Sequence, residues 1–157
     1  MVFLTNMDLM RAAQKYNIPL LSVFSKNEPP KKLYKGGYII NLENSMDSAG
    51  NRLDGSHWVA MWVDDKNYAC YFDPFGFPPP VEIQHILNKF IPYDVNRTEI
   101  QSIRTGICGY YCIYFLWYMN RHRGVKPHQR FKNFVDLFND KKPSKNGGIL
   151  KELLKKT

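Results

Sequence analysis

The sequence predicts an α+β fold, in which a small central mixed sheet packs on a buried helix that starts at Cys108. Two observations predict it. Strand-forming residues, separated by turn residues, gather between residues 38 and 73, and apolar residues at helical spacing lie before and after that region. The run from Cys108 to about Arg121 is apolar on nearly every side, which is typical of a helix inside the core. A chain of 157 residues with 44% hydrophobic content is about one domain long, so we expect residues 1–157 to form a single domain.

One helix and one strand are predicted in the N-terminal part. Asn6 is a capping residue, the apolar residues after it keep near-helical spacing, and Pro19 comes shortly after them. These features predict a helix over residues 6–16. Two prolines interrupt residues 26–32, which we expect to form a loop, and the first strand is predicted at residues 38–42.

A hairpin is predicted in the middle of the chain. Residues 56–63 are almost continuously apolar, which predicts a strand buried on both faces, and residues 68–73 form the return strand. A three-residue turn at residues 64–66 would place His57 directly opposite Asp73 on the same face of the sheet. A two- or four-residue turn would instead send the Asp73 side chain to the other face. We adopt the three-residue turn, because the asparagine that follows it tolerates positive φ.

The next elements are separated by prolines and glycines. A surface helix over residues 81–90 begins after a run of three prolines, and a short strand is predicted around residues 99–103. Thr105 and Gly106 then turn the chain into the buried helix, which Gly124 ends. This order places a turn directly before the buried helix.

The last third of the chain is basic. The net charge is +8, and the positive residues gather late, at Arg121, Arg123, Lys126, Arg130 and the lysines from Lys141 to Lys156. We predict a helix over residues 131–138, a basic, mobile tail from about residue 141 to 148, and a short helix over residues 149–156. The charge predicts non-specific contact with a polyanion, and the alternative interpretation is a solvated basic face.

Cys108 is the candidate nucleophile. The three cysteines are odd in number and suggest no disulfide framework, so at least one free thiol needs an explanation. Cys108 opens the buried helix, where unpaired N–H groups and the helix dipole stabilise a thiolate. We interpret Gly109 as leaving room for a substrate backbone, and Cys112, one turn further into the apolar helix, as a packing residue.

Three other side chains complete a site for acyl transfer. His57 stands at the start of the predicted central strand and is the candidate base, which Asp73 would orient. Gln101 lies seven residues before Cys108 and could bring its amide beside the backbone N–H of the nucleophile to form an oxyanion hole. The predicted catalytic residues are therefore Cys108, His57, Asp73 and Gln101, and we predict no metal site.

Three motifs in one order carry a resemblance to a known family: Gly55-Ser56-His57-Trp58, Phe72-Asp73-Pro74-Phe75-Gly76-Phe77, and Gln101 followed by Cys108-Gly109-Tyr110-Tyr111-Cys112. The chain resembles the adenain family, the maturation cysteine proteases of adenoviruses, and related proteases of virophages, Polinton-type elements and large DNA viruses. The order His, acid, Gln, Cys is also the order of that family. The resemblance extends from about Asn41 to Trp117.

The resemblance implies a papain-like core of the adenain type and a thiol endopeptidase activity. The implied substrates are viral capsid or core precursor polypeptides, cleaved during virion maturation near Gly-Gly-type sites. This sequence departs from the family at two points. The acid is Asp73 where adenain carries Glu, and no Cys lies between Val81 and Ile100 to tether an activating peptide. A tethered peptide cofactor is therefore not expected, whereas DNA is a candidate activator.

The expected partners follow from charge and hydropathy. We expect a monomer that requires no cofactor for its chemistry and that contacts DNA non-specifically through its basic C-terminal third. The longest apolar run, Ile113–Met119, is well short of the roughly 20 residues that cross a bilayer, and the N-terminal end has no signal-peptide pattern. We therefore expect no membrane contact, and a location in the host cytoplasm or viral factory with packaging in the virion.

Other functions fit parts of the sequence. The same residues serve proteases of ubiquitin-like modifiers, although their typical Asp before the catalytic Cys is Ile107 here, and acetyltransferases of the same clan, for which we identify no acetyl-CoA pocket. A protease fold that has lost its activity is disfavoured, because all four chemical positions hold competent residue types. A zinc or nucleic-acid module is another alternative, because the spacing of two cysteines and two histidines loosely resembles that of a zinc finger. These residues are Cys108, Cys112, His122 and His128. The segment between the second Cys and the first His is an apolar helix, which disfavours a zinc finger. The sequence around Gly148 resembles a site that such proteases cut, which predicts self-cleavage after this residue.

Overall fold

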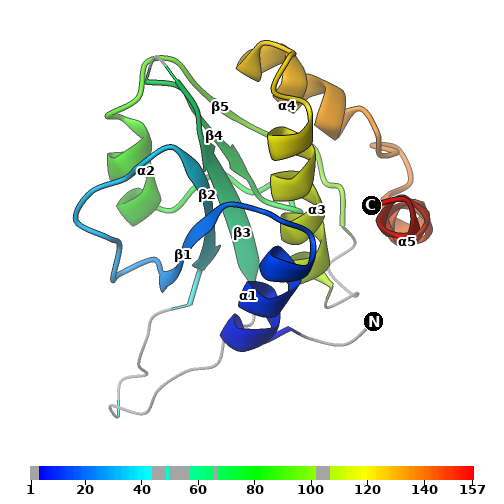
Figure 1. Cartoon of the computed structure of the whole chain (residues 1–157), viewed down its shortest axis with the longest axis horizontal. Coiled ribbons are helices and arrows are strands. Elements are labelled where there is room, and N and C mark those ends of the chain that lie inside the picture. The colour runs from blue at the N-terminus through cyan, green and yellow to red at the C-terminus, as the bar shows by residue number, and fades with distance from the viewer. Residues whose placement is uncertain (1–3, 44–48, 50–56, 66, 102–106) are drawn as a thin grey trace.

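The computed structural model describes residues 4–43, 49, 57–65, 67–101 and 107–157. The described residues form a five-stranded sheet with the order β1-β2-β3-β4-β5. Its strands are β1 (Leu20–Ser25), β2 (Gly36–Asn41), β3 (Trp58–Val63), β4 (Ala69–Phe72) and β5 (Tyr93–Val95). β1 and β2 are parallel, as are β4 and β5, whereas β3 is antiparallel to both of its neighbours. The predicted α+β class with a mixed central sheet is confirmed (Figure 1).

Helices cover both faces of this sheet (Figure 1). One face packs on the N-terminal helix and on the helices of the last third, which are α1 (Asn6–Lys15), α3 (Cys108–Arg121), α4 (Pro127–Val135) and α5 (Asn146–Lys155). The other face packs on α2 (Val81–Leu87). Two hydrophobic clusters result, one on each side of the sheet.

β3 is the strand that is buried on both faces. Trp58, Ala60 and Trp62 belong to the cluster that contains α3, whereas Val59 and Met61 belong to the cluster that contains α2. All residues of this strand are buried. The continuous apolar run therefore serves two cores at once, and the predicted double burial is confirmed.

α3 is the buried helix that the sequence predicts. It begins at Cys108, and nine of its 14 residues are buried. Phe115, near its middle, stacks on Phe72 of β4 and packs edge-on against Phe131 of α4. This helix therefore ties the sheet to the C-terminal part of the chain. No helix within the described residues is long and apolar enough to cross a membrane.

The β3–β4 hairpin departs from the predicted register. Ala60 pairs with Phe72, which places Asp73 opposite Val59 and not opposite His57. The turn lies one residue later than predicted, because the N–H of the residue after β3 still donates across the hairpin, with an N···O distance of 2.9 Å. Moving the turn by one residue shifts the pairing by two positions, so the side chains at 57 and 73 stay on the same face.

Several element ends also differ from the predictions. The N-cap of α1 is Thr5 and not Asn6, because the Thr5 side chain accepts the Asp8 N–H in a capping box. β1 and β5 were not predicted, and both lie at the edges of the sheet. Residues 99–101 form no strand, because the N–H groups of residues 100 and 101 donate to a turn carbonyl instead of a neighbouring strand. The rest of that predicted strand lies outside the described residues.

The C-terminal tail is helical where the sequence predicts mobility. A 3-10 helix, Pro143–Lys145, leads directly into α5, and Asn146 at the start of α5 is fully buried. Gly148 lies inside the first turns of α5. A protease cleaves extended backbone, so cleavage after Gly148 would require this helix to unwind. The predicted self-cleavage therefore has no support in the folded chain.

Arg130 connects the hairpin to the helices behind it. Its side chain is almost fully buried, and its Nη1 donates to Asp64 Oδ2 over 2.6 Å. The remaining guanidinium hydrogens go to the carbonyl groups of Met119, Arg123 and Val125. One buried fork therefore holds the β3–β4 turn, the end of α3 and the start of α4 together.

Candidate active site

Cys108 lies at the N-terminus of α3, against the start of β3. The thiol is 2% exposed, and its Sγ accepts the backbone N–H of Trp58 over 3.3 Å. Ile107 precedes it as the N-cap and supplies no side-chain cap. The unpaired N–H groups and the dipole of the first turn of α3 therefore favour negative charge at this position.

His57 pairs with Asp73 and lies within the electrostatic influence of Cys108. Its Nε2 lies 2.8 Å from Asp73 Oδ1, and the Asp73 side chain is fully buried. Burial by itself would lower the pKa of His57, but hydrogen bonds to Asp73 and Cys108, together with their charges, raise it to about 9. The ring therefore carries a proton at neutral pH, held by the Asp73 carboxylate.

Phe75 orients the His57 ring, and the sequence analysis did not single it out. The two rings stack with centroids 4.2 Å apart and an interplanar angle of 8°. The Phe75 N–H also donates to Asp73 Oδ1 over 2.8 Å, the same oxygen that contacts His57. Phe75 thereby restricts both partners of the ion pair. Its place in the Asp-Pro-Phe-Gly-Phe motif was the available signal.

Asn96 holds the backbone of Asp73 and was also missed. Its Oδ1 accepts the Asp73 N–H over 2.8 Å, and its Nδ2 donates to the Asp73 carbonyl over 2.6 Å. The side chain is 5% exposed, although it lies in a loop that follows β5. A buried amide with both groups satisfied costs little, and it fixes the point at which β4 ends. No local pattern signals a contact between residues 23 positions apart.

Gln101 is connected to the Asp73 turn through its backbone. The Gly76 N–H donates to the Asp73 carbonyl, and the φ of 76° at Gly76 is one that glycine adopts readily. A Cβ at Gly76 would lie 2.6 Å from the Thr98 carbonyl oxygen, so the turn needs glycine. Pro74, inside this turn, accepts the Gln101 N–H over 2.8 Å, and the Gln101 side chain is fully buried. The segment from Gln101 to Cys108 includes residues outside the described ranges.

Gly109 and Cys112 serve packing. A Cβ at Gly109 would lie 3.2 Å from Leu4 and 3.3 Å from Leu9, so this glycine allows α3 to approach the N-terminal segment. The interpretation that Gly109 makes room for a substrate backbone is therefore wrong. Cys112 is fully buried in the main core, and burial raises the pKa of its thiol well above the ordinary value. A thiol in this environment stays protonated, in agreement with its interpretation as a packing residue.

The geometry of α3 opposes the zinc-module alternative. Cys112 and His122 are separated by ten residues of α3 and its C-cap, which corresponds to about 15 Å along the axis at 1.5 Å per residue. His128 Nδ1 lies 2.8 Å from Asp94 Oδ2 on the sheet edge. The described residues contain no group of three or more metal-ligating side chains. The four residues of the finger-like spacing therefore cannot meet at one ion.

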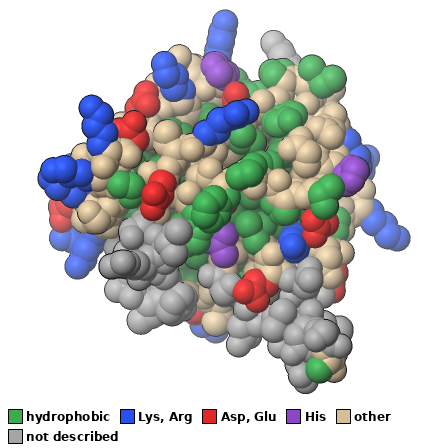
Figure 2. Space-filling view, turned by 180° about the vertical axis from the view of Figure 1, so that it is seen from behind, with side chains coloured by type: hydrophobic (Ala, Val, Ile, Leu, Met, Phe, Trp, Pro, Cys, Tyr) green, Lys and Arg blue, Asp and Glu red, His purple; other side chains and the backbone are tan. Residues whose placement is uncertain are grey.

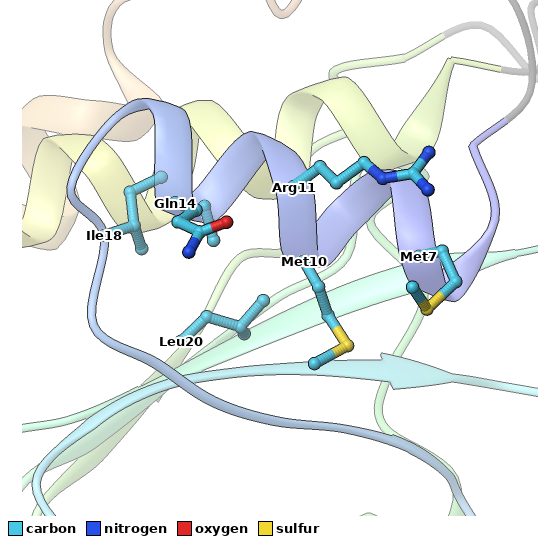
Figure 3. Close-up of a pocket in the computed structure, with 7 residues that line it drawn as sticks. Met7, Met10, Arg11, Gln14, Ile18 and Leu20 are labelled. Carbon is cyan, nitrogen blue, oxygen red and sulfur yellow. The ribbon is translucent and has the colours of Figure 1, made fainter.

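A cavity of about 510 Å³ lies between α1 and β1, away from these side chains. Figure 3 shows its lining, in which the Met10 side chain extends from α1 toward Leu20. Neither Cys108 nor the other predicted catalytic residues line it. The cavity therefore forms no part of the site described above.

Comparisons with known proteins agree with the motifs. No family model matches the chain. The protease of bovine adenovirus 4 is 30% identical over 101 residues, which cover 53% of this chain and 50% of the relative. The protease of human adenovirus A serotype 12 is 26% identical over 88 residues, which cover 45% of this chain and 43% of that protease. The resemblance to the adenain family is confirmed. This adenain-like chain spans about half the length of the curated relatives that it matches.

The fold of the adenain-like chain also has a counterpart among solved structures. The crystal structure of the selenomethionine form of ASFV pS273R protease superposes with a TM-score of 0.50 at 17% sequence identity. The match covers 92% of this chain and 65% of that protein. The predicted fold is therefore confirmed by a protease structure of low sequence identity.

Proposed function

We propose that this chain is a cysteine endopeptidase in which Cys108 is the nucleophile, His57 the acid and base, and Asp73 the group that orients His57. The pairing of His57 with a buried carboxylate, together with a thiol at a helix N-terminus whose charge raises the pKa of that histidine, supports this proposal most directly. Each of these features favours the thiolate–imidazolium pair that a cysteine protease needs. The adenovirus relatives are proteases, which supports the same reaction.

The proposed reaction has two stages. The Cys108 thiolate attacks the peptide carbonyl, the carbonyl π electrons move to its oxygen, and a tetrahedral oxyanion forms. The Gln101 amide and the Cys108 backbone N–H stabilise this oxyanion. When it collapses, His57 gives its proton to the leaving amine, and an acyl-enzyme thioester remains. His57 then removes a proton from water, which attacks the thioester and releases the acid and Cys108.

The reactivity of Cys108 toward iodoacetamide tests the ion pair without any knowledge of the substrate. At pH 6 an ordinary thiol is less than about 1% ionised, so rapid labelling requires a stabilised thiolate. We expect selective alkylation of Cys108 at pH 6, and a rate at least about tenfold lower in His57→Ala. Peptide mapping by mass spectrometry identifies the labelled cysteine.

His128→Ala is the matched control for this measurement. His128 also contacts a carboxylate, but its side chain is 73% exposed and lies on the sheet edge. We expect this variant to label at the wild-type rate. Slow labelling spread over all three cysteines, or equal rates in wild type and His57→Ala, would exclude the proposed pair.

We further propose that the substrates are viral capsid or core precursor polypeptides cut near Gly-Gly-type sites during virion maturation, and that DNA stimulates the reaction. Figure 2 shows Lys and Arg side chains gathered along its left edge, on the side of the molecule that carries α5 in Figure 1. Lys151 and Lys156 of this C-terminal region are exposed. A polyanion on this side would concentrate enzyme and DNA-associated precursors together. The same proposal places the protein in the viral factory and in the virion.

DNA is expected to raise kcat/KM for a basic precursor fragment several-fold at low salt, and the effect should vanish at high salt because screening removes it. A double variant, Lys151→Gln with Lys156→Gln, should weaken the stimulation. Lys35→Gln is the control, because Lys35 is already paired with Asp65. Stimulation by DNA that does not depend on the salt concentration would contradict DNA binding through this basic side. So would stimulation that persists in the double variant and falls in Lys35→Gln.

A further inference from the structure

Asn146 is a fully buried amide whose hydrogen bonds all reach other segments of the chain. Its Oδ1 accepts the Asn139 N–H over 2.6 Å, and its Nδ2 donates to the Asn139 carbonyl over 2.8 Å. The second Nδ2 hydrogen goes to the Ile100 carbonyl over 2.8 Å. Because one partner is a donor and the other two are acceptors, these partners determine the orientation of the amide.

The bond to Ile100 reaches the segment that carries the proposed oxyanion donor. Ile100 directly precedes Gln101, and the N–H groups of both residues donate to the Pro74 carbonyl, over 2.9 and 2.8 Å. Pro74 belongs to the turn that begins at Asp73. Asn146 therefore holds, from the side of α5, a segment that the Asp73 turn holds from the other side.

α5 also lies beside the residue that precedes the nucleophile. A Cβ at Gly147 would meet the Cδ1 of Ile107 at 3.7 Å, and Ile107 is the N-cap of α3. Leu150, one turn further along α5, is fully buried in the same core as Cys108. Figure 1 shows α5 at the flank of α3. α5 is thus next to both described ends of the stretch between Gln101 and Cys108.

We propose that Asn146 is a positioning residue for the oxyanion hole, which it serves by holding the Ile100–Gln101 backbone at a set distance from the N-terminus of α3. This inference rests on the function proposed above. An oxyanion donor stabilises the transition state only if it is already in place, so a small displacement of its backbone lowers the rate of acyl transfer. Alkylation of the thiol passes through no oxyanion, so it reports on the Cys108 thiolate and not on the Gln101 amide.

The test compares Asn146→Ala and Asn146→Ser with the wild type, using a Gly-Gly peptide coumarin amide and iodoacetamide. We expect Asn146→Ala to lower kcat about 10- to 100-fold with KM within about twofold, the pattern of a lost transition-state interaction. The rate of Cys108 alkylation at pH 6 should not change. Asn146→Ser retains one donor and should recover part of kcat.

Phe131→Leu is the control for a loss of stability. Phe131 is a core residue of α4 that packs edge-on against Phe115 of α3. This variant should lower the melting temperature and leave kcat of the folded protein unchanged. A kcat in Asn146→Ala that equals wild type after correction for the folded fraction, or an alkylation rate that falls in parallel with kcat, would overturn the proposal.

Amide hydrogen exchange separates this inference from the proposed function. If Asn146 holds the segment, the N–H groups of Ile100 and Gln101 should lose protection in Asn146→Ala and keep it in Phe131→Leu. Unchanged protection in Asn146→Ala overturns the positioning role. Absence of hydrolysis and of acylation in the wild type overturns the proposed function, and with it the catalytic role of Asn146. The hydrogen-exchange rates of Ile100 and Gln101 still show in that case whether Asn146 holds their backbone.

Discussion

Replacing Asp73 with Asn is expected to lower kcat/KM by up to about 10⁴-fold, the loss that follows when the carboxylate behind the catalytic histidine of a serine protease becomes an amide. Asp73 Oδ1 lies 2.8 Å from His57 Nε2, and the Asp73 side chain is fully buried. An Asn at this position carries no charge, and its NH₂ group can face the ring N–H as a competing donor. The imidazolium then loses its main stabilising partner. Steady-state hydrolysis of a peptide amide measures the effect.

The pH profile distinguishes loss of the ion pair from loss of the fold. Asp73 and Cys108 raise the pKa of His57 from 6.5 to about 9, so the wild-type kcat/KM should fall as the pH rises through about 9. Without the Asp73 charge the pKa of His57 falls, and the basic limb should move to lower pH in Asp73→Asn. Asp65→Asn removes an exposed carboxylate and should leave rate and limb unchanged. If the basic limb of the kcat/KM profile stays near pH 9 in Asp73→Asn, a group other than His57 titrates at that pH.

Replacing Arg130 with Ala is expected to lower the free energy of unfolding by about 3–5 kcal/mol, as removal of one partner of a buried ion pair typically does. The variant leaves Asp64 without its ion-pair partner, although Trp62 Nε1 and the Asp65 N–H still donate to its carboxylate. It also leaves three backbone carbonyl groups without the guanidinium donors. Urea denaturation at pH 7 measures the difference.

Lys35→Ala is the matched control, because it removes an ion pair that is exposed at both ends. The Lys35 and Asp65 side chains are 47% and 66% exposed, and such pairs contribute about 0–1 kcal/mol. Burial opposes ionisation of Asp64, but hydrogen bonds from Trp62, Asp65 and Arg130 and the charge of Arg130 hold its pKa below the ordinary value. The Arg130 contribution should therefore be present above pH 3.8 and fade as the pH falls through the lowered pKa of Asp64. Equal losses in both variants would contradict the structural role of Arg130.

Much of the fold was predictable because its elements have one-dimensional signals. The run at residues 58–63 is apolar at every position, and burial of β3 on both faces is the reason. α3 could be read in the same way from Cys108 onward. β1 and β5 could not, because they are edge strands whose residues are only partly buried for most of their length. The hairpin register depended on the position of the turn, which the composition of the turn did not specify.

The sequence by itself singled out the candidate catalytic residues. Motif order and spacing selected Cys108, His57, Asp73 and Gln101, because nucleophile, base, carboxylate and amide are recognisable residue types beside recognisable element ends. Their catalytic roles remain predictions, whereas the contact of His57 with Asp73 is a feature of the structure.

Only the tertiary structure decided how this site is supported. Asn96 holds Asp73 across 23 positions, Asn146 holds Ile100 across 46, and Arg130 holds Asp64 across 66. Residues so far apart in sequence meet only after the two faces of the sheet are covered by helices. A buried amide or guanidinium is stable only where its partners converge, and no periodicity or local spacing records that convergence.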